Sequence, residues 1–436
     1  MSLPRYAEYK ESWLPWVGAI PRAWDIKPLM SVARERRESN KGMEEDNLLS
    51  LSYGRIVQKD ATSNDGLLPE SFETYQVVHP DDIVFRLTDL QNDKRSLRTA
   101  PVRQKGIITS AYLAVVPRLI NSGYFAYLLR SYDLTKVFYS IGGGLRQSMK
   151  YADVKRLPVL LPSTREQEAI ADFLDCETAR IDALIAEQET LLALLAEKRQ
   201  ATISHAVTRG LDPNVPMKDS GIAWLGEVPA HWNVVLLRRI VSAVETGTTP
   251  ISGPSVEAVE SGTGWFTPGD FTALDLTAST KFVAKEHVAG GEVRCFPEGA
   301  ILVVGIGATL GKVGILNAPA SANQQVNAIL IGAGHSARFF AYSLSAKAEI
   351  MKFLSNSSTI GILNQAKTKE IPIAVPPFDE QRRVVDELDF EVRKFDAISA
   401  EAELAKTLLR ERRSALISAA VTGQIDVRGL VSGAAA

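Results

Sequence analysis

The sequence holds little cysteine, little histidine and no long apolar run, and each scarcity excludes a class of protein. The two cysteines, Cys176 and Cys295, lie far apart in 436 residues, which excludes a disulfide framework and indicates a reducing cytoplasm. The five histidines lack the spacing of zinc ligands. No apolar stretch is long enough to span a membrane, and residues 1–10 lack the core of a signal peptide. We therefore expect a cytoplasmic protein without membrane contact.

Net charge is also small, at −2, but the charges are segregated along the chain. Residues 81–156 contain thirteen Lys and Arg against six Asp and no Glu. Residues 165–199 contain four basic against nine acidic side chains. A basic segment followed by an acidic one suits local contact with a polyanion beside a surface that meets a protein. An unevenly charged solvated surface fits the same counts equally well.

A long block of the sequence occurs twice. Residues 166–208 return as residues 380–422 without a gap, and nearly half of the positions are identical. A shorter repeat around Trp16 and Trp24 returns around Trp224 and Trp232. A chain with two similar halves is expected to behave as a pseudo-dimer and to hold a partner that itself has two ends.

Each copy of the long block is predicted to be one helix. Ser163 and Glu166 form a capping-box pattern, and no Pro or Gly follows until Gly210. A helix of about 40 residues is about 60 Å long, more than a compact domain can cover. We expect the two helices to cover each other as an antiparallel coiled coil; packing of each on its own domain, or homodimerisation, are the alternatives. The heptad-like stripe contains Ile170, Leu174, Ile181, Leu184, Leu191 and Leu195, matched by Val384, Leu388, Phe395, Ile398, Ala405 and Leu409.

The regions between these helices read as mixed strands and turns with one helix each, near residues 124–129 and 338–344. Each ends in a Pro-flanked apolar strand, at residues 157–162 and 371–376. The predicted fold class is α+β: two mixed domains, two long helices and an internal pseudo-twofold repeat. The predicted boundaries are 1–162 and 211–376 for the domains, 163–210 and 377–424 for the helices, and 425–436 for a flexible tail.

Two motifs that suggest catalysis fail on inspection. The glycine-rich segment 305–312 lacks the phosphate-loop pattern because Ile306 and Val313 stand where that pattern requires its first Gly and its Ser or Thr, so it reads as a turn between strands. Residues 375–378 resemble an amino-methyltransferase loop, but Val375 cannot hydrogen-bond a target amine. Neither a nucleophile–base arrangement nor a metal-ligand cluster is recognisable. We expect a chain without catalytic or metal-binding residues.

A basic cluster within residues 86–105 mixes long cations with amide side chains. Cations suit phosphates, while Asn, Gln and Arg suit base edges, so the cluster predicts contact with DNA; a solvated loop is the alternative. The candidate DNA-binding residues of the chain are Arg86, Gln91, Asn92, Lys94, Arg95, Arg98, Arg103, Lys105, Arg146, Lys150, Thr248, Thr249, Thr309, Lys312, Gln324 and Gln325.

The order of these segments resembles the specificity subunit of a type I restriction-modification system. The resemblance covers nearly the whole chain. It rests on the two Glu-Gln to Ala-Val-Thr helices, on the openings at residues 10–24 and 218–232, and on the short motifs at 82–86, 106–112, 247–250 and 311–314. It implies two target-recognition domains that each read half of a split DNA site, and conserved helices that space them.

The same resemblance implies partners and cofactors. Two methyltransferase subunits would dock on the helices and carry S-adenosylmethionine, and a restriction subunit would use ATP and Mg²⁺, with no cofactor on this chain. The alternatives are a stand-alone methyltransferase or nuclease, and a structural coiled-coil adaptor. The candidate docking residues are Glu166, Gln167, Asp172, Asp175, Glu380, Gln381, Asp386 and Asp389.

Overall fold

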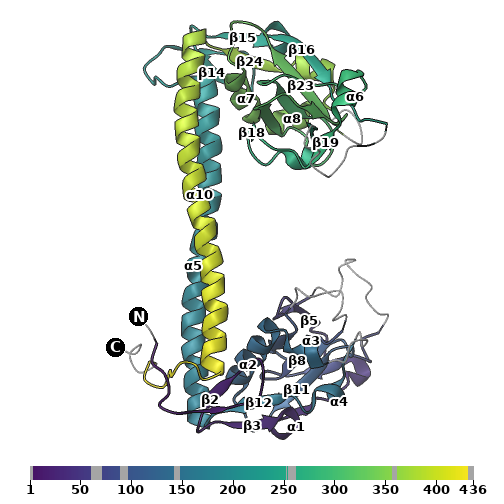
Figure 1. The fold of residues 1–436 in the computed structure, drawn as a ribbon, viewed down its shortest axis with the longest axis vertical. Coiled ribbons are helices and arrows are strands. Elements are labelled where there is room, and N and C mark those ends of the chain that lie inside the picture. Colours follow the sequence, from purple (N-terminus) through teal and green to yellow (C-terminus); the bar gives the residue numbers. More distant parts are fainter. Residues whose placement is uncertain are drawn as a thin grey trace. The chain divides into compact units, whose positions relative to one another are not determined.

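The computed structural model describes residues 3–59, 71–88, 97–141, 148–251, 253, 262–355 and 361–430. The chain divides into two compact units, Met1–Glu189 with Glu403–Ala436 (unit 1) and Thr190–Ala402 (unit 2). The division cuts both long helices, α5 (Thr164–Arg209) and α10 (Phe378–Val421). Each unit therefore consists of a globular domain and one end of the helix pair (Figure 1).

The domain of unit 1 is built on a four-stranded antiparallel sheet in the order β4-β11-β8-β9. Four two-stranded pairs, β1-β2, β3-β12, β5-β6 and β7-β10, surround this sheet. The strands are β1 (Tyr9–Glu11), β2 (Ala19–Pro21), β3 (Asp25–Pro28), β4 (Ala33–Glu35), β5 (Leu49–Ser52), β6 (Arg55–Gln58), β7 (Gln76–Val78), β8 (Ile83–Phe85), β9 (Thr99–Pro101), β10 (Gly106–Ile108), β11 (Leu113–Pro117) and β12 (Pro158–Leu161). The helices are α1 (Leu29–Val32), η1 (Lys41–Met43), α2 (Ser122–Leu134), α3 (Val137–Ile141) and α4 (Tyr151–Val154).

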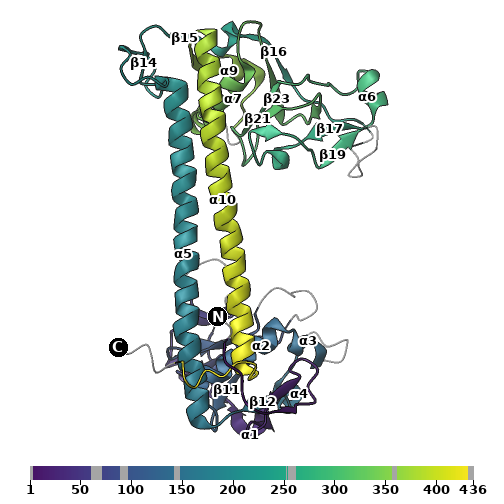
Figure 2. The ribbon, with the colours of Figure 1, turned by 60° about the vertical axis from the view of Figure 1, so that its left-hand side comes forward.

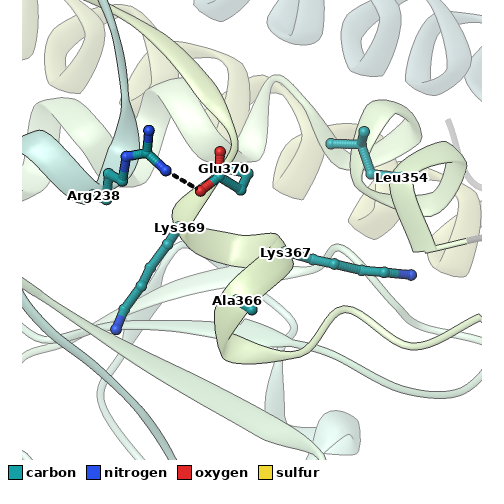
Figure 3. A pocket seen from close by; sticks show the side chains of 6 residues that line it. All are labelled: Arg238, Leu354, Ala366, Lys367, Lys369 and Glu370. Atoms are coloured by element: carbon teal, nitrogen blue, oxygen red, sulfur yellow. Dashed lines mark hydrogen bonds and ion pairs between the residues drawn. The ribbon is translucent and has the colours of Figure 1, made fainter.

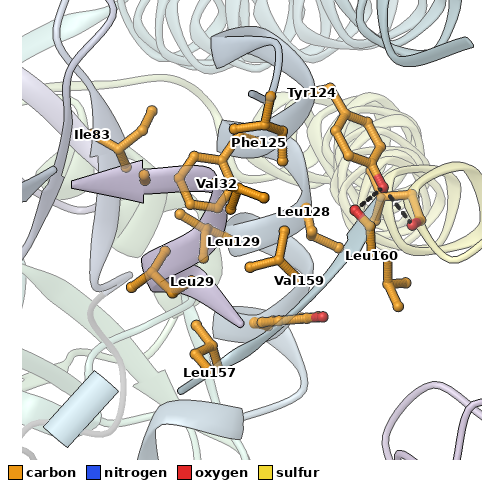
Figure 4. Packing of buried hydrophobic residues seen from close by; sticks show 14 of the residues in the cluster. Leu29, Val32, Ile83, Tyr124, Phe125, Leu128, Leu129, Leu157, Val159 and Leu160 are labelled. Atoms are coloured by element: carbon orange, nitrogen blue, oxygen red, sulfur yellow. Dashed lines mark hydrogen bonds between the residues drawn. The ribbon is translucent and has the colours of Figure 1, made fainter. Parts of the chain in front are cut away.

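The core of unit 1 joins the domain to both long helices. Side chains of α1, α2, β8 and β12 pack together (Figure 4), and Ile170 and Leu174 of α5 and Val421 of α10 belong to the same buried cluster. The buried hydroxyl of Tyr124 donates to the carbonyl of Leu160 at 3.1 Å and lies 3.5 Å from the carbonyl of Val421. Burial of this continuous apolar surface, at roughly 25 cal/mol per Å², fixes the domain on the helix ends.

The domain of unit 2 has a five-stranded sheet, β16-β23-β20-β21-β18, and a three-stranded sheet, β19-β17-β22. Figure 2 shows the same domain from a second direction. The strands are β13 (Met217–Asp219), β14 (Glu227–Pro229), β15 (Asn233–Leu236), β16 (Val241–Thr246), β17 (Thr263–Phe266), β18 (Asp275–Leu276), β19 (Lys281–Val283), β20 (Ile301–Val304), β21 (Val313–Leu316), β22 (Ser321–Ala322), β23 (Val326–Ile331) and β24 (Pro372–Val375). The helices are η2 (Leu237–Arg239), η3 (Pro268–Asp270), α6 (Lys285–Ala289), α7 (Ala337–Ser345), α8 (Ala348–Ser355) and α9 (Gln365–Lys369).

Several predicted elements are confirmed. The two Pro-flanked strands are β12 and β24, and each pairs antiparallel with the first strand after a buried tryptophan, β3 after Trp24 and β15 after Trp232. The glycine-rich segment 305–312 is a turn between the antiparallel strands β20 and β21. Gly311 there has φ +87°, and a Cβ at this position would lie 2.8 Å from the carbonyl oxygen of Ala348, so only glycine fits.

The long helices pack antiparallel within each unit. Arg413 of α10 reaches Asp182 of α5 at 3.0 Å in unit 1, and Arg199 of α5 reaches Asp396 of α10 at 3.6 Å in unit 2. The predicted packing of the two long helices on each other is confirmed, although their apolar stripe is only partly covered. Ile181 is buried, whereas Leu184 and Ile398 are 45% and 43% exposed. Along the described ranges, no helix is apolar enough over sufficient length to cross a membrane.

The expected flexible tail is also corrected over residues 425–430. Val427 is fully buried in the core of unit 1. The backbone N–H of Asp426 donates to the carbonyl of Pro4 at 2.8 Å, and the Arg428 guanidinium lies 4.9 Å from the centre of the Tyr6 ring. The tail is ordered because it closes the core against the first residues of the chain.

Candidate DNA-reading domains and their attachment to the helices

A buried glutamine at the start of each long helix fastens that helix to its own domain. Gln167 Oε1 accepts from the backbone N–H of Asn121, the N-cap of α2, at 2.8 Å, and its Nε2 donates to the carbonyl of Pro162 at 2.9 Å. In unit 2, Gln381 accepts from the N–H of Ser336, the N-cap of α7, at 2.8 Å and donates to Pro376 at 2.9 Å. We call each of these two-bond contacts a glutamine latch. Its acceptor and donor fix a helix start and a strand end at once.

The glutamate before each latch also bonds within the chain, but differently in the two units. Glu166 accepts from the hydroxyl of Tyr6 at 2.6 Å and from the indole N–H of Trp24 at 3.0 Å. This carboxylate therefore faces the N-terminal segment, whereas the predicted capping box directs it back to Ser163. In unit 2, Glu380 meets His231 at 2.8 Å, and the indole N–H of Trp232 is buried without an acceptor among the described residues.

An aspartate two turns further along each helix holds the domain helix a second time. Asp175 accepts from the Tyr127 hydroxyl of α2 at 2.7 Å, and burial is the main cause that raises the pKa of Tyr127 to about 12. Asp389 accepts from the Tyr342 hydroxyl of α7 at 2.6 Å and from Arg338 Nε at 2.7 Å. Each domain is thus attached to its helix at two separate places.

These contacts correct the candidate docking residues. Glu166, Gln167 and Gln381 are buried, so they are not available to a partner protein. Glu380, Asp175 and Asp389 bond inside their own units but are not buried, and Asp175 is exposed. Asp172 and Asp386 are exposed and stay candidates. The sequence showed polar residues on a helix but gave no sign of the distant side chains and backbone groups that cover them.

Arg98 is the clearest correction among the candidate DNA contacts of unit 1. It is fully buried, its Nη1 donates to the carbonyl of Thr88 at 3.0 Å, and its Nε donates to Tyr139 at 3.2 Å. Its backbone N–H and that of Thr99 both donate to Asp133, whose pKa burial raises to about 6. This arginine supports the ends of the basic segment from inside and is not open to a phosphate.

The other candidates of unit 1 lie at the surface or outside the described residues. Arg103, Lys105 and Lys150 are exposed, and Lys105 Nζ lies 3.2 Å from Glu45 Oε2. Arg86 is half-buried, and its Nε has no acceptor among the residues described. Outside the described residues lie Gln91, Asn92, Lys94, Arg95 and Arg146.

In unit 2 the structure brings four candidates together where β16 ends beside the turn before β23. The Thr249 hydroxyl hydrogen-bonds Gln324, and both side chains are exposed. Gln325 accepts from Asn323 at 3.1 Å. The Thr248 hydroxyl accepts from the backbone N–H of Arg294, so it stabilises the turn and is not a free contact. The result is an exposed polar edge of amide and hydroxyl groups, suited to reading base edges.

Arg294 is an exposed cation at this edge that the sequence analysis missed. Its Nη1 donates to the carbonyl of Thr246 at 2.7 Å, and its Nε lies 3.9 Å from Glu245 Oε2. Among the described residues, neither Thr309 nor Lys312 forms a hydrogen bond with the residues of this edge. Lys312 Nζ donates to the carbonyl of Phe271 at 3.1 Å and lies beside α5. The segment 305–312 therefore forms a tight turn at Gly311, while Lys312 contacts the region where the domain meets α5.

A pocket of about 520 Å³ lies between α8 and α9 in unit 2 (Figure 3). Arg238 and Glu370 pair across one side of it, and the Lys369 side chain points away from that pair. It brings together no nucleophile and base. Over the described part of the chain, no group of three or more His, Cys, Asp or Glu is placed to hold a metal ion.

Comparisons with known proteins agree with this architecture. Residues 229–405 match the family described as type I restriction modification DNA specificity domain. The chain is 27% identical to the type I restriction enzyme MjaIX specificity subunit of Methanocaldococcus jannaschii over 171 residues, 38% of this chain and 39% of that one. It is 21% identical to the EcoDI specificity subunit of Escherichia coli over 337 residues, 72% of each chain.

Two solved structures share the fold. A chain solved in work on complex assembly and conformational transition of the type I R-M system has a TM-score of 0.70 at 16% identity, with 92% of this chain and 98% of that chain covered. The HsdS subunit from Thermoanaerobacter tengcongensis has a TM-score of 0.50 at 15% identity, with 93% and 98% covered. At these identities the similarity concerns the fold.

Proposed function

We propose that this chain, which belongs to the family of type I restriction-modification specificity subunits, selects the bipartite DNA site on which a separate methyltransferase acts. The observation that carries the proposal is the double glutamine latch. Two domains with different surfaces are each fixed to the start of a long helix by the same pair of bonds. A domain held in this way keeps a defined position on its helix, so helix length sets the separation of two half-sites.

Each domain would read its half-site through a small set of polar side chains. In unit 1 the exposed cations Arg103, Lys105 and Lys150 suit phosphates. In unit 2 the Thr249–Gln324 pair and Arg294 suit base edges and the adjoining backbone. Phosphate contacts would dominate affinity and make it depend on salt, while the base-edge contacts would discriminate sequences.

Exposed leucine and isoleucine side chains are better candidates for the methyltransferase docking surface than the acidic residues named from the sequence. In unit 1, Leu184 and Leu408 are 45% and 54% exposed. In unit 2, the matching positions of the repeated block, Ile398 and Leu194, are 43% and 57% exposed. Large apolar side chains that helix packing leaves in water indicate a protein interface. We propose that each pair seats one methyltransferase subunit, two in all, and that a restriction subunit joins the assembly.

In this proposal the cofactors belong to the partners. S-adenosylmethionine would bind to the methyltransferase subunits, and ATP and Mg²⁺ would bind to the restriction subunit. The methyltransferase would also flip the target adenine out of the duplex, because chemistry on a base requires access to its edge. This chain would act with them in the cytoplasm.

Methylome sequencing of a host that expresses the chain with its methyltransferase tests the main proposal. The expected result is adenine methylation at one split motif with a fixed spacer. Methyl transfer from labelled S-adenosylmethionine by the purified chain alone would instead show a stand-alone enzyme. Footprinting without a bipartite protected site would leave only a structural adaptor.

The docking proposal is tested separately by counting subunits. Native mass spectrometry of the complex with Leu184→Asp should show one methyltransferase copy, and so should Ile398→Asp, because a carboxylate at an apolar contact is desolvated without a partner. Thr407→Asp, on the same helix pair and also exposed, is the control and should keep both copies. Two copies in both test variants would refute these seats.

A further inference from the structure

Unit 1 contains a pocket of about 430 Å³ where its domain meets the helix pair. Four arginines line it, one on the β5–β6 hairpin, one on α2 and two on α10: Arg55, Arg130, Arg410 and Arg413. We call this site the arginine pocket. Asp182 and Glu189 of α5 are the acidic side chains in its described lining. The described walls therefore carry an excess of positive charge.

The acids neutralise the arginines incompletely. Arg410 lies 3.1 Å from Glu189, but both side chains are more than half exposed, so this pair contributes little. Arg413 pairs with Asp182: its Nη2 donates to Oδ2 at 3.4 Å, and its Nε lies 3.0 Å from Oδ1 without a hydrogen bond from that nitrogen. Arg130 donates to the carbonyls of Gly54 and Thr99. Burial lowers the pKa of Arg130; the nearby Asp133 opposes this, and the positive charges of Arg413 and Arg55 lower the pKa further.

The matching junction in unit 2 also carries cations. A pocket of about 190 Å³ there is lined by Arg199, Lys312, Tyr342 and Ser345, among others. Arg199 and Arg413 occupy the same position of the repeated block, and the Nε of each is buried without a hydrogen bond. Ser345 stands where unit 1 has Arg130, counted from the matched tyrosines Tyr127 and Tyr342. Helix pairing explains one Arg and one Asp per unit. Unit 1 has three further arginines at this junction: Arg130, which donates to backbone carbonyls, Arg410, which pairs with Glu189 at the surface, and Arg55.

We propose that the arginine pocket binds a backbone phosphate of DNA beside the half-site read by unit 1. Guanidinium forks match phosphate oxygens in geometry and keep their charge when partly buried. Leu97, in the pocket wall, begins the segment that leads through β9 to the exposed Arg103 and Lys105, the cations proposed to meet DNA. This inference rests on the proposed function. A carboxylate of the methyltransferase is the competing ligand.

The test compares Arg55→Gln and Arg410→Gln with Arg412→Gln. Arg55 and Arg410 are exposed, so their replacement leaves the core intact. Arg412 is the matched control, since it lies on the same helix and its side chain lines a different hollow, beside Phe173 and Leu416. Binding of the assembled complex to duplex DNA is measured by fluorescence anisotropy between 50 and 200 mM salt.

Because the pocket holds one phosphate, each single variant should reduce the magnitude of the slope of log K against log salt by up to about 0.9, and the double variant should lose about 0.9 in total. Affinity should fall equally for cognate and non-cognate duplexes, because a phosphate contact carries no sequence information. Arg412→Gln should keep the wild-type slope. Slopes of Arg55→Gln and Arg410→Gln equal to that of the control would overturn the proposal.

The competing ligand gives a different result. If the pocket holds a methyltransferase carboxylate, Arg410→Gln loses a methyltransferase copy in native mass spectrometry while the salt slope stays unchanged, and this outcome also overturns the proposal. Failure of the proposed function is distinguishable, because the wild-type complex would then show no preference for any bipartite site. The salt slope can still be measured on non-cognate duplex in that case, so the two questions separate.

Discussion

Replacing Gln381 with Met should loosen the domain of unit 2 on its helix. Gln381 is 1% exposed, and its amide satisfies the N–H of Ser336 and the carbonyl of Pro376. Methionine has a similar volume but neither donor nor acceptor, so both backbone groups lose their partner inside the protein. Each buried unsatisfied group costs about 1–3 kcal/mol, which gives a loss of about 2–6 kcal/mol for the pair.

Calorimetry of the purified chain measures this loss. For a unit of roughly 200 residues, 1 kcal/mol shifts Tm by about 2–4 °C, so the Tm of unit 2 should fall by about 4–24 °C. Arg382→Met is the control, because Arg382 is the next residue of α10 and is exposed. The functional readout is the spacing of half-sites that the complex accepts, which should broaden in Gln381→Met and stay narrow in the control.

A second substitution separates the latch from simple packing. Gln381→Glu keeps an acceptor for the N–H of Ser336 but removes the donor to Pro376 at neutral pH. Protonation of the new carboxyl restores a donor, so stability lost at pH 7 should return as the pH falls. A Tm of Gln381→Met within about 1 °C of that of Arg382→Met would refute the latch as an attachment.

Two further predictions concern unit 2 and the helix pair. Lys347 is buried and donates only to the backbone carbonyl and hydroxyl of Ser343 in the bonds that the structure shows; burial lowers its pKa to about 8. The unfolded chain keeps this proton up to about pH 10.5, so the free energy of unfolding of the wild type should rise between about pH 8 and 10.5 relative to that of Lys347→Met. Denaturant unfolding measures both free energies, and a constant difference between them over this pH range would contradict the argument. Insertion of one heptad at equivalent points of α5 and α10 should lengthen the preferred half-site spacing by about 10 Å, or roughly three base pairs, in methylome sequencing. An unchanged spacing would show that helix length does not set it.

The elements that follow from local sequence were predictable. The Pro-flanked strands β12 and β24 combine an apolar run with residues that stop a strand at both ends. The two long helices contain no Pro or Gly, so nothing in their interiors interrupts the hydrogen-bond ladder. The glycine-rich turn at 305–312 was recognisable because two required residues of the alternative motif are absent.

The site residues were less predictable, because their roles depend on contacts distant in sequence. Gln167 bonds Asn121 across 46 positions, and Glu166 bonds Trp24 across 142. A repeated Glu-Gln pair on a helix looks the same whether it faces a partner protein or its own domain. Arg98 illustrates the same limit of prediction from sequence. Five basic residues lie between positions 94 and 105, and nothing in the sequence sets Arg98 apart as the one that the fold buries. Leu184 and Ile398 escaped notice because they belong to the heptad-like stripe, and such a stripe is ordinarily read as buried.

Identical residues in the two copies of the repeat also do different work. Glu166 and Glu380 align, yet Glu166 accepts two hydrogen bonds, from Tyr6 and Trp24, while Glu380 meets the half-exposed His231. By the spacing of the shorter repeat, Asn214 stands in the place of Tyr6, and the Trp232 indole N–H is left without an acceptor among the described residues. The carboxylate turns toward the histidine because the hydroxyl that directs it inward in unit 1 is missing. The glutamine latch, whose partners are backbone groups, is the same in both units because a backbone N–H and carbonyl persist whatever side chain stands there. Attachment through backbone groups therefore lets the domains diverge in surface while their fastening to the helices stays constant.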